Sequence, residues 1–276
     1  MAGCCRRVRL SNRHLRSAAR RTLIALLLVA AACFVSPQPR ASVVPTILQQ
    51  EAHPPAAAPL AVVGLGDSVM AGTACSCPGV VAAYADRLRA AAGRSVSALN
   101  LGVPGDTTAD LVDQLRTDHR TSAAVAAADV VVVTIGANDL LPLQQQRDAD
   151  SCPARCYGPA SQAMGTRLSD ALALIRSLRS GPPSTVLVTT YWNVFTDGAV
   201  ARAAGGQPQL DWSEQVTQAA DQAICVAADT HQGRCIDLTR WFDDEAADHT
   251  RLLAADGDHP NAAGVDVIAD ALLAAT

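Results

Sequence analysis

The sequence has no lysine and few aromatic residues. All 22 basic residues of the 276-residue chain are arginine, and tryptophan, tyrosine and phenylalanine together make up 3% of it. So few aromatic rings argue against a broad stacking surface for sugars. Apolar residues nevertheless reach 49% while charged residues make up only 17%. The chain can therefore bury a large core and is not disordered as a whole.

Acidic residues are missing from positions 1–40, which carry eight of the arginines. The rest of the chain has 14 arginines against 26 acidic residues, an excess of 12 negative charges. A body that acidic is a poor match for a phosphate backbone, so we expect no nucleic-acid partner.

Signatures of several other protein classes are also missing. Residues 64–69 are GLGDSV, which places valine where a dinucleotide-binding fingerprint needs its third glycine. The G-x-S-x-G elbow of the larger α/β-hydrolases is absent, as are a phosphate-binding loop and a cluster of histidine ligands. We therefore expect neither a cofactor nor a bound metal.

The first 35 residues are typical of a targeting segment. Residues 1–21 carry seven arginines, and residues 22–35 form an apolar run of 14. That run is too short to span about 30 Å of hydrocarbon comfortably as a helix. Alanines 30–32 offer a small-x-small cleavage site, so we expect a signal peptide and a secreted or cell-envelope protein. An uncleaved membrane anchor, a twin-arginine signal at residues 20–21 and lipidation of Cys33 are the alternatives.

Residues 36–58 contain five prolines and no sustained period, which predicts a linker, and residues 59–276 form one domain without repeats. Short apolar runs in this domain alternate with helical stretches, which implies a parallel sheet covered on both faces. We thus predict an α/β fold, a three-layer α/β/α sandwich around a five-stranded, mainly parallel sheet. The expected strands are 60–65, 95–101, 129–135, 185–190 and 234–238, and the expected helices are 80–92, 107–116, 164–178, 213–230 and 260–273. We expect Asp106 to cap the second helix and Pro260 to open the last.

Residues able to do chemistry follow the first three predicted strands. Ser68 comes after the first strand in a Gly-Asp-Ser turn, where backbone N–H groups can face a developing oxyanion. A glycine-rich turn with Gly102 and Gly105 follows the second strand, and Asn138 follows the third. Each motif alone is explained as a turn or a helix cap. Because the carboxyl ends of parallel strands share one edge of the sheet, we expect these residues to converge.

An Asp-x-x-His motif lies near the C-terminus. Asp256 and His259 are three residues apart just before the last predicted helix, so the carboxylate can hold one imidazole nitrogen while the other accepts a proton from serine. Of the six histidines, only His259 combines this spacing with this position. His249, after Asp248, is the alternative.

The four motifs in this order resemble those of the SGNH (GDSL-type) hydrolase family, over about residues 60–274. The resemblance implies a flavodoxin-like fold and a serine esterase or lipase. It implies that Ser68 is the nucleophile and also an oxyanion donor, with Gly105 and Asn138 as the other donors. His259 would be the base and Asp256 its orienting carboxylate.

The sequence departs from the usual family pattern at one motif position. Val69 stands where leucine is usual, which is a conservative change. Separately, Gly102 is the second candidate for the glycine donor, after Gly105. Cysteines outside the family core resemble those of exported actinobacterial relatives.

Six cysteines lie in the expected domain, and an even number in an exported protein predicts disulfides. They are Cys75, Cys77, Cys152, Cys156, Cys225 and Cys235. A zinc site is the alternative, but neither C-x-C nor C-x-x-x-C is the usual spacing, and an oxidising compartment removes free thiolates.

We expect Cys225 and Cys235 to pair with each other. The cysteines of residues 75–77 and 152–156 follow Ser68 and Asn138 respectively, so they can pair across the active-site edge. Local pairing of Cys152 with Cys156 is the alternative, and it leaves Cys75 with Cys77 in a very small ring.

The substrate is the least determined feature. Residues 191–195 follow the fourth strand, and Trp192 and Phe195 would line an acyl pocket or else pack in the core. We expect a monomer acting on short- or medium-chain carboxylic esters, including lipids. Removal of acetyl groups from polysaccharide or peptidoglycan is the main alternative, and a non-catalytic cell-surface binding protein is a third.

Overall fold

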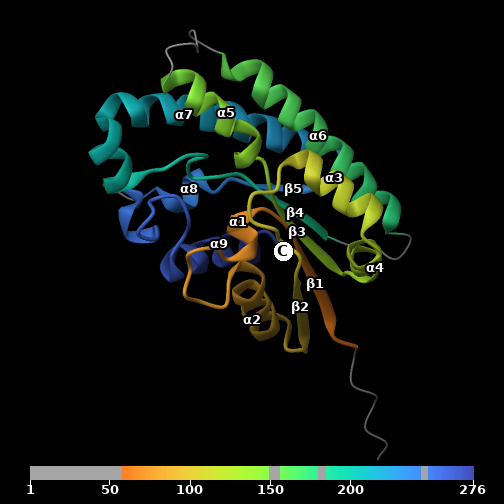
Figure 1. Cartoon of the computed structure of the whole chain (residues 1–276). Coiled ribbons are helices and arrows are strands. Elements are labelled where there is room, and N and C mark those ends of the chain that lie inside the picture. The colour runs from red at the N-terminus through yellow and green to blue at the C-terminus, as the bar shows by residue number, and fades with distance from the viewer. Residues whose placement is uncertain (1–57, 149–155, 180–184, 244–247) are drawn as a thin grey trace, which may run out of the picture. The chain divides into compact units, whose positions relative to one another are not determined.

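A computed structural model describes residues 58–148, 156–179, 185–243 and 248–276 (Figure 1). The predicted targeting segment, and all of the predicted linker except Ala58, lie outside these residues. Within the described ranges, no helix combines the length and apolar character needed to cross a membrane.

A five-stranded parallel sheet forms the centre of the domain. Its order is β2 (Val96–Asn100), β1 (Leu60–Gly66), β3 (Val130–Thr134), β4 (Thr185–Thr189) and β5 (Arg234–Ile236), and every neighbouring pair is parallel. β-Branched valine suits a strand with helices on both faces, and all five residues of β3 are buried. The predicted five-stranded α/β sheet is confirmed.

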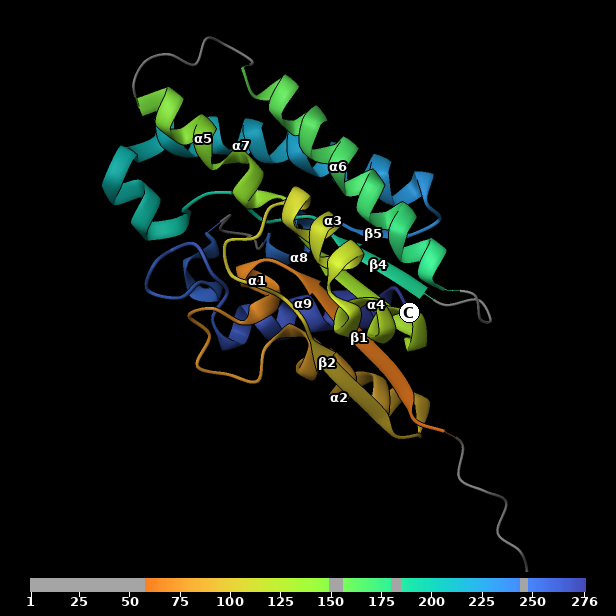
Figure 2. The same ribbon diagram turned by 45° about the vertical axis from the view of Figure 1, so that its right-hand side comes forward.

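Helices cover both faces of this sheet (Figures 1 and 2). On one face α2 (Val80–Ala92) packs against α9 (Ala262–Ala274). On the other, α6 (Tyr157–Leu178) packs against the remaining long helices. These are α3 (Thr108–Thr117), α4 (His119–Ala127), α5 (Ala137–Asp148) and α7 (Gly198–Thr230). Three one-turn helices complete the described elements: α1 (Ser68–Ala71), α8 (Thr239–Phe242) and the 3₁₀ helix η1 (His249–Leu252).

Two predicted helix starts were wrong. Thr107, and not Asp106, caps α3, since its hydroxyl accepts from Asp110 N while the Asp110 side chain accepts from Thr107 N, a reciprocal capping box. Asn261, and not Pro260, precedes α9, because its side chain accepts from two N–H groups of the first turn.

Two predicted helices are longer than expected, and two helices were not predicted. α6 begins at Tyr157 and not at residue 164. α7 starts at Gly198 because two helices join at Gly206, whose φ of 63° is non-helical. α4 and α5 were not predicted as helices, and Pro142 lies inside α5.

The pairing of the first two domain cysteines was also wrong. Cys75 bonds Cys77, with Cα atoms 5.1 Å apart, so neither bridges to residues 152–156. A left-handed backbone at Ala74, with φ 60°, accompanies this tight turn. The expected Cys225–Cys235 bond is present, also with a Cα–Cα distance of 5.1 Å. Cys156 is disulfide-bonded, and Cys152 lies outside the described residues.

Candidate active site

The turn after β1 presents the Ser68 hydroxyl. Asp67 caps α1, and its carboxylate accepts from Val69 N at 3.0 Å, which makes Ser68 the first helical residue. An N–H at this position has no acceptor within its own helix. Gly66 makes the close approach possible, since a Cβ there would overlap the Thr134 carbonyl and its φ is +139°. Ser68 is half-buried and follows the carboxyl end of β1, where it lines a cavity.

Asp67 is a buried acid beside this serine. It is 1% exposed, and the Tyr191 hydroxyl donates a hydrogen bond to its Oδ2. Burial raises the pKa of Asp67 to about 7, although the hydrogen bonds from Tyr191 and Val69 oppose the rise. The Asp67 carboxyl therefore exchanges its proton near neutral pH.

Tyr191 connects two parts of the site. It follows β4 and is 1% exposed, and its hydroxyl also accepts from Ala137 N at 3.4 Å. The Tyr191 hydroxyl thus bonds both Asp67, the residue before Ser68, and Ala137, the residue before Asn138. Asp67 and Tyr191 were not among the predicted site residues. The only sequence signals were the Asp of the Gly-Asp-Ser turn and an aromatic residue after a strand.

Within the described parts of the chain, the Gly105 N–H of the glycine turn makes no hydrogen bond. Gly102 N is already occupied, donating to Asn100 Oδ1 at 2.9 Å, and a Cβ on Gly102 would lie 2.7 Å from Ala71 N. Gly105 lines a cavity with Ser68 and has a φ of +88°, which favours glycine. Gly105 is therefore the better placed of the two candidate donors.

Asn138 lies at the start of α5, after β3. One of its two amide hydrogens is engaged, since Nδ2 donates to Asp106 O at 2.9 Å, and the other has no acceptor among the described residues, so it can serve a ligand. The next residue, Asp139, accepts from Thr108 N at 2.8 Å and from Thr108 Oγ1 at 2.6 Å. These bonds tie the start of α3 to the start of α5 and hold the glycine turn beside Asn138.

His259 is held by Asp256 in the loop before α9. The distance from Nδ1 to Asp256 Oδ2 is 2.8 Å, while Asp256 Oδ1 accepts from the backbone N–H groups of Asp258 and His259. Burial alone would raise the pKa of Asp256, but these hydrogen bonds outweigh it and lower the pKa. Nδ1 is thereby directed at the carboxylate, which leaves Nε2 for a substrate or a nucleophile.

One cavity collects these groups. It has a volume of about 280 Å³, and its lining includes Ser68, Gly105, Asn138 and His259. Among the described residues, no direct hydrogen bond joins the Ser68 hydroxyl to the imidazole. Catalytic hydrogen bonds are often long before substrate binds, so this geometry is compatible with proton transfer. The structure thus brings together four groups that the sequence predicted to converge.

The two predicted substrate contacts differ. Trp192 lines the cavity with Ser68, whereas Phe195 does not, being 1% exposed and stacked on Trp212 at a centroid distance of 5.1 Å. Core packing, the alternative interpretation of the segment, accounts for Phe195. The alternative base, His249, lines another cavity, where its Nδ1 lies 2.7 Å from Asp197 Oδ2.

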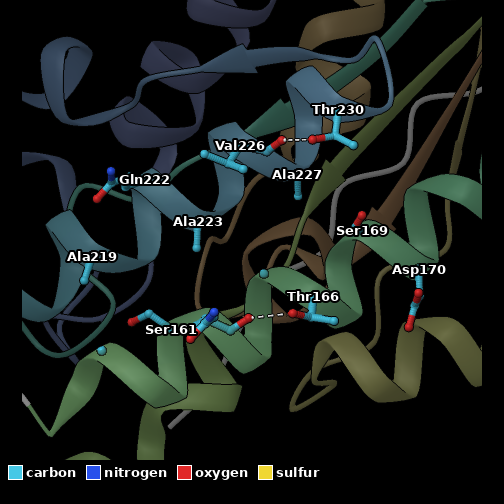
Figure 3. A pocket seen from close by; sticks show the side chains of 13 residues that line it. Ser161, Thr166, Ser169, Asp170, Ala219, Gln222, Ala223, Val226, Ala227 and Thr230 are labelled. Atoms are coloured by element: carbon cyan, nitrogen blue, oxygen red, sulfur yellow. Dashed lines mark hydrogen bonds between the residues drawn. The ribbon is translucent and has the colours of Figure 1, made fainter.

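A larger hollow lies between α6 and α7. It measures about 530 Å³ and shares none of its lining with the cavity around Ser68. Figure 3 shows its short side chains, such as Ala223 and Thr166, with the Thr166 and Thr230 hydroxyls bonded within their own helices. Ser169 of this groove lies 2.7 Å from His231 Nε2, but among the described residues no carboxylate is hydrogen-bonded to the other nitrogen of that imidazole, so the pair lacks the orienting acid that His259 has.

Comparisons with known proteins bear on the family and the fold of this chain. Residues 65–267 match the GDSL-like lipase/acylhydrolase family. The lipase Lip_vut3 from a goat rumen metagenome is similar in structure, with a TM-score of 0.62, 21% identity, and coverage of 78% of this chain and 97% of that one.

Two further solved structures are similar. A lipase/acylhydrolase from Enterococcus faecalis has a TM-score of 0.54 and 22% identity, covering 78% of this chain and 94% of its own. A catalytic mutant of Axe2, an acetylxylan esterase from Geobacillus stearothermophilus, has a TM-score of 0.54 and 18% identity, covering 78% and 93%. At such identities the likeness establishes a shared fold. The search of curated proteins found no match.

Proposed function

Because the chain belongs to the GDSL-like lipase/acylhydrolase family and is therefore an ester hydrolase, we propose that Ser68 is its nucleophile. His259 is the general base, and Asp256 orients it. The observation that carries this proposal is the shared cavity, which Ser68 and His259 line from opposite ends of the domain together with two amide donors.

The reaction is acyl transfer through a covalent intermediate. His259 Nε2 takes the Ser68 proton as Oγ attacks the ester carbonyl, and the protonated imidazole then returns the proton to the departing alcohol. Water, deprotonated by the same imidazole, releases the acid. The oxyanion accepts hydrogen bonds from Ser68 N, Gly105 N and Asn138 Nδ2, which act where charge develops in the transition state.

The cavity favours a small acyl group. Its volume of about 280 Å³ includes the space around the reacting groups, and Leu141 and Val194 add apolar wall. We therefore favour short- over medium-chain acyl esters. Removal of acetyl groups from a glycan is the second candidate, because an acetyl group is the smallest acyl group to suit this volume.

Export is part of the proposal. The basic and apolar character of residues 1–35 supports a signal peptide, and disulfides at Cys75–Cys77 and Cys225–Cys235 are compatible with an oxidising compartment. Intact-mass measurement of the protein from culture medium and from membranes should find a mature chain that begins near residue 33. A full-length chain in the membrane fraction would indicate an uncleaved anchor instead.

The test of the catalytic assignment combines turnover and labelling. p-Nitrophenyl esters of graded chain length should be hydrolysed, fastest for short acyl chains, and a serine-directed phosphonate should modify Ser68 in a peptide map. Ser68→Ala should lose several decades of kcat. Activity of Ser68→Ala close to that of the wild type, or labelling at another serine, would exclude the mechanism.

A further inference from the structure

Two of the turns that carry oxyanion donors follow neighbouring strands. Ser68 comes after β1 and Asn138 after β3, and these strands run parallel with Gly66 opposite Thr134. A backbone hydrogen bond from Asp67 N to Thr134 O, at 3.0 Å, extends the pairing by one residue. Ser68 and Asn138 lie beyond that bond, where the sheet no longer fixes the spacing of the two chains.

The Tyr191 hydroxyl links these two turns. It donates to Oδ2 of Asp67, the neighbour of Ser68. It also accepts, at 3.4 Å, from the N–H of Ala137, the neighbour of Asn138. Ala137 is the first residue of α5, so its N–H has no acceptor within that helix. Because β3 lies between β1 and β4, the Tyr191 side chain reaches across the end of β3 to bond Asp67.

The backbone of Tyr191 is fixed from two sides. Its N–H donates to Asp221 Oδ1 at 3.1 Å, and its carbonyl accepts from Thr239 Oγ1 at 3.1 Å. The residue is also 1% exposed. A hydroxyl on a buried ring with a fixed backbone has little freedom to move, so it can hold both turns in place.

Tyr191 borders the catalytic cavity but is not able to donate to a substrate there. A tyrosine has a single hydroxyl hydrogen, and that of Tyr191 is committed to Asp67. Burial and the charge of Asp67 raise the pKa of Tyr191 well above its ordinary value, so the phenol stays protonated and does not act as a base. Any role of Tyr191 in the reaction therefore comes through the residues that it holds.

The spacing of the two turns matters because the oxyanion has to meet donors from both. Ser68 N comes from one turn and Asn138 Nδ2 from the other, and each has to lie about 2.7–3.1 Å from the oxyanion. Misplacement of a reacting group by about 1 Å can cost about a hundredfold in rate. The link at Tyr191 opposes such a displacement before the charge develops.

We propose that Tyr191 is a positioning residue of the reaction, whose hydroxyl sets the spacing between the turn that carries Ser68 and the turn that carries Asn138. The proposal rests on the proposed function, since it takes these two residues to be the nucleophile and an oxyanion donor. It adds the loop after β4 to the four segments that carry the sequence motifs.

Tyr191→Phe removes the hydroxyl and keeps the ring. We expect kcat on p-nitrophenyl acetate to fall by about 10- to 100-fold while KM changes by less than about threefold, because the oxyanion forms only after the ester has bound. Rates are expressed per reactive site, counted by titrating Ser68 to completion with a phosphonate. An unfolded fraction of the variant then does not lower the measured kcat.

Tyr84→Phe is the matched control. Tyr84 is also buried, and its hydroxyl lies 2.7 Å from Thr276 Oγ1, so this variant loses a comparable hydrogen bond. Tyr84 belongs to α2, outside the described lining of the catalytic cavity, so its kcat should be that of the wild type.

The two variants separate failure of this proposal from failure of the proposed function. Equal kcat values for Tyr191→Phe and Tyr84→Phe would overturn the positioning role, while turnover by the wild type would leave the proposed function standing. A wild type without turnover, or without labelling at Ser68, would remove the proposed function and the positioning role with it.

A double-mutant cycle tests whether Tyr191 acts through Asn138. Once Asn138→Ala has removed that donor, the spacing of its turn matters less, so adding Tyr191→Phe should cost less than about threefold in kcat. A loss as large as in the protein with Asn138 intact would contradict the proposal.

Asp67→Asn separates the link between the turns from the charge of the carboxylate. Oδ1 of the new amide can still accept from Val69 N, and its Nδ2 can donate to the Tyr191 oxygen, so the turns stay linked. We expect kcat to stay within about threefold of the wild type, because donor positions are kept. This variant also provides the test if Tyr191→Phe does not fold, and a loss beyond that range would overturn the proposal.

Discussion

Two carboxylates next to the two reacting side chains have opposite environments. Asp67, beside Ser68, is 1% exposed and has a pKa raised to about 7, whereas the Asp256 side chain, bonded to His259, is 40% exposed and has a lowered pKa. The buried acid receives hydrogen bonds from Val69 N and the Tyr191 hydroxyl, and it fixes the turn that carries the nucleophile. The exposed carboxylate of Asp256 stays ionised and holds the His259 imidazole. Burial thus separates a positioning role from an electrostatic role for the same side chain type.

The largest effect should follow loss of the exposed carboxylate. Asp256→Ala removes the acceptor 2.8 Å from His259 Nδ1, so the imidazole loses both its orientation and the stabilisation of its charged form. We expect kcat/KM on p-nitrophenyl acetate to fall by about 10²–10⁴. Asp258→Ala is the control from the same loop, since Asp258 lies 3.8 Å from Nδ1. A greater loss in Asp258→Ala would reverse the assignment.

The second largest effect should follow loss of an oxyanion donor. Asn138→Ala removes one oxyanion donor, which typically costs about 3–4 kcal/mol of barrier, or a hundred- to a thousandfold in kcat. KM should change much less, because the bond forms in the transition state. Steady-state kinetics on one ester checks both values. A change confined to KM would mean that Asn138 binds substrate without stabilising the oxyanion.

The pH dependence of stability should show the contrast directly. The folded pKa of Asp67, about 7, lies above the unfolded value of 3.8. Between these values the folded protein holds a proton that the unfolded chain has released. The contribution of Asp67 to the free energy of unfolding is therefore fully present below pH 3.8 and is lost as the pH rises to about 7. Asp256, whose pKa is lowered, contributes stability that is lost as the pH falls below 3.8.

Asp67→Asn should remove the first of these slopes. Between pH 5 and 7 the free energy of unfolding should fall less steeply with pH in this variant than in the wild type. The difference between the two slopes should be up to about 1.4 kcal/mol per pH unit, measured by urea titration. Asp221 also has a pKa raised to about 7 by burial, so only the difference between the two proteins reports on Asp67. Equal slopes would mean that Asp67 is ionised throughout.

A smaller effect should follow from Tyr191→Phe. The variant removes the hydroxyl that donates to Asp67 and leaves a buried carboxyl short of one donor, at a cost of about 1–3 kcal/mol in unfolding free energy. Tyr157→Phe is the matched control, because its hydroxyl donates at 3.4 Å to the exposed Gln215 and should change stability by less than about 0.5 kcal/mol. Equal stability of the two variants would exclude an anchoring role for Tyr191.

Much of the fold could be predicted because its strands carry a local signal. The run of valines in β3 and the alternation of apolar runs with helices indicated a parallel sheet, and the structure has five parallel strands. α5 was missed because Pro142 and three consecutive glutamines give residues 137–148 no clear apolar face.

The site residues could be proposed from the sequence because each stands in a local motif after a strand or before a helix. The Asp67–Tyr191 bond could not, since it joins residues 124 positions apart through the adjacency of β1, β3 and β4. The Cys75–Cys77 bond also went against expectation, because it depends on a left-handed residue between Gly72 and Cys75 that no sequence pattern indicates.

The most direct test is a crystal structure of the protein inhibited by an alkyl phosphonate. The phosphorus atom should be bonded to Ser68 Oγ, with a phosphonyl oxygen about 2.7–3.1 Å from Ser68 N, Gly105 N and Asn138 Nδ2. His259 Nε2 should lie within hydrogen-bond distance of the leaving-group side of the adduct. A phosphonyl oxygen directed away from Gly105 and Asn138, or an adduct at another residue, would contradict the assembly proposed for this site.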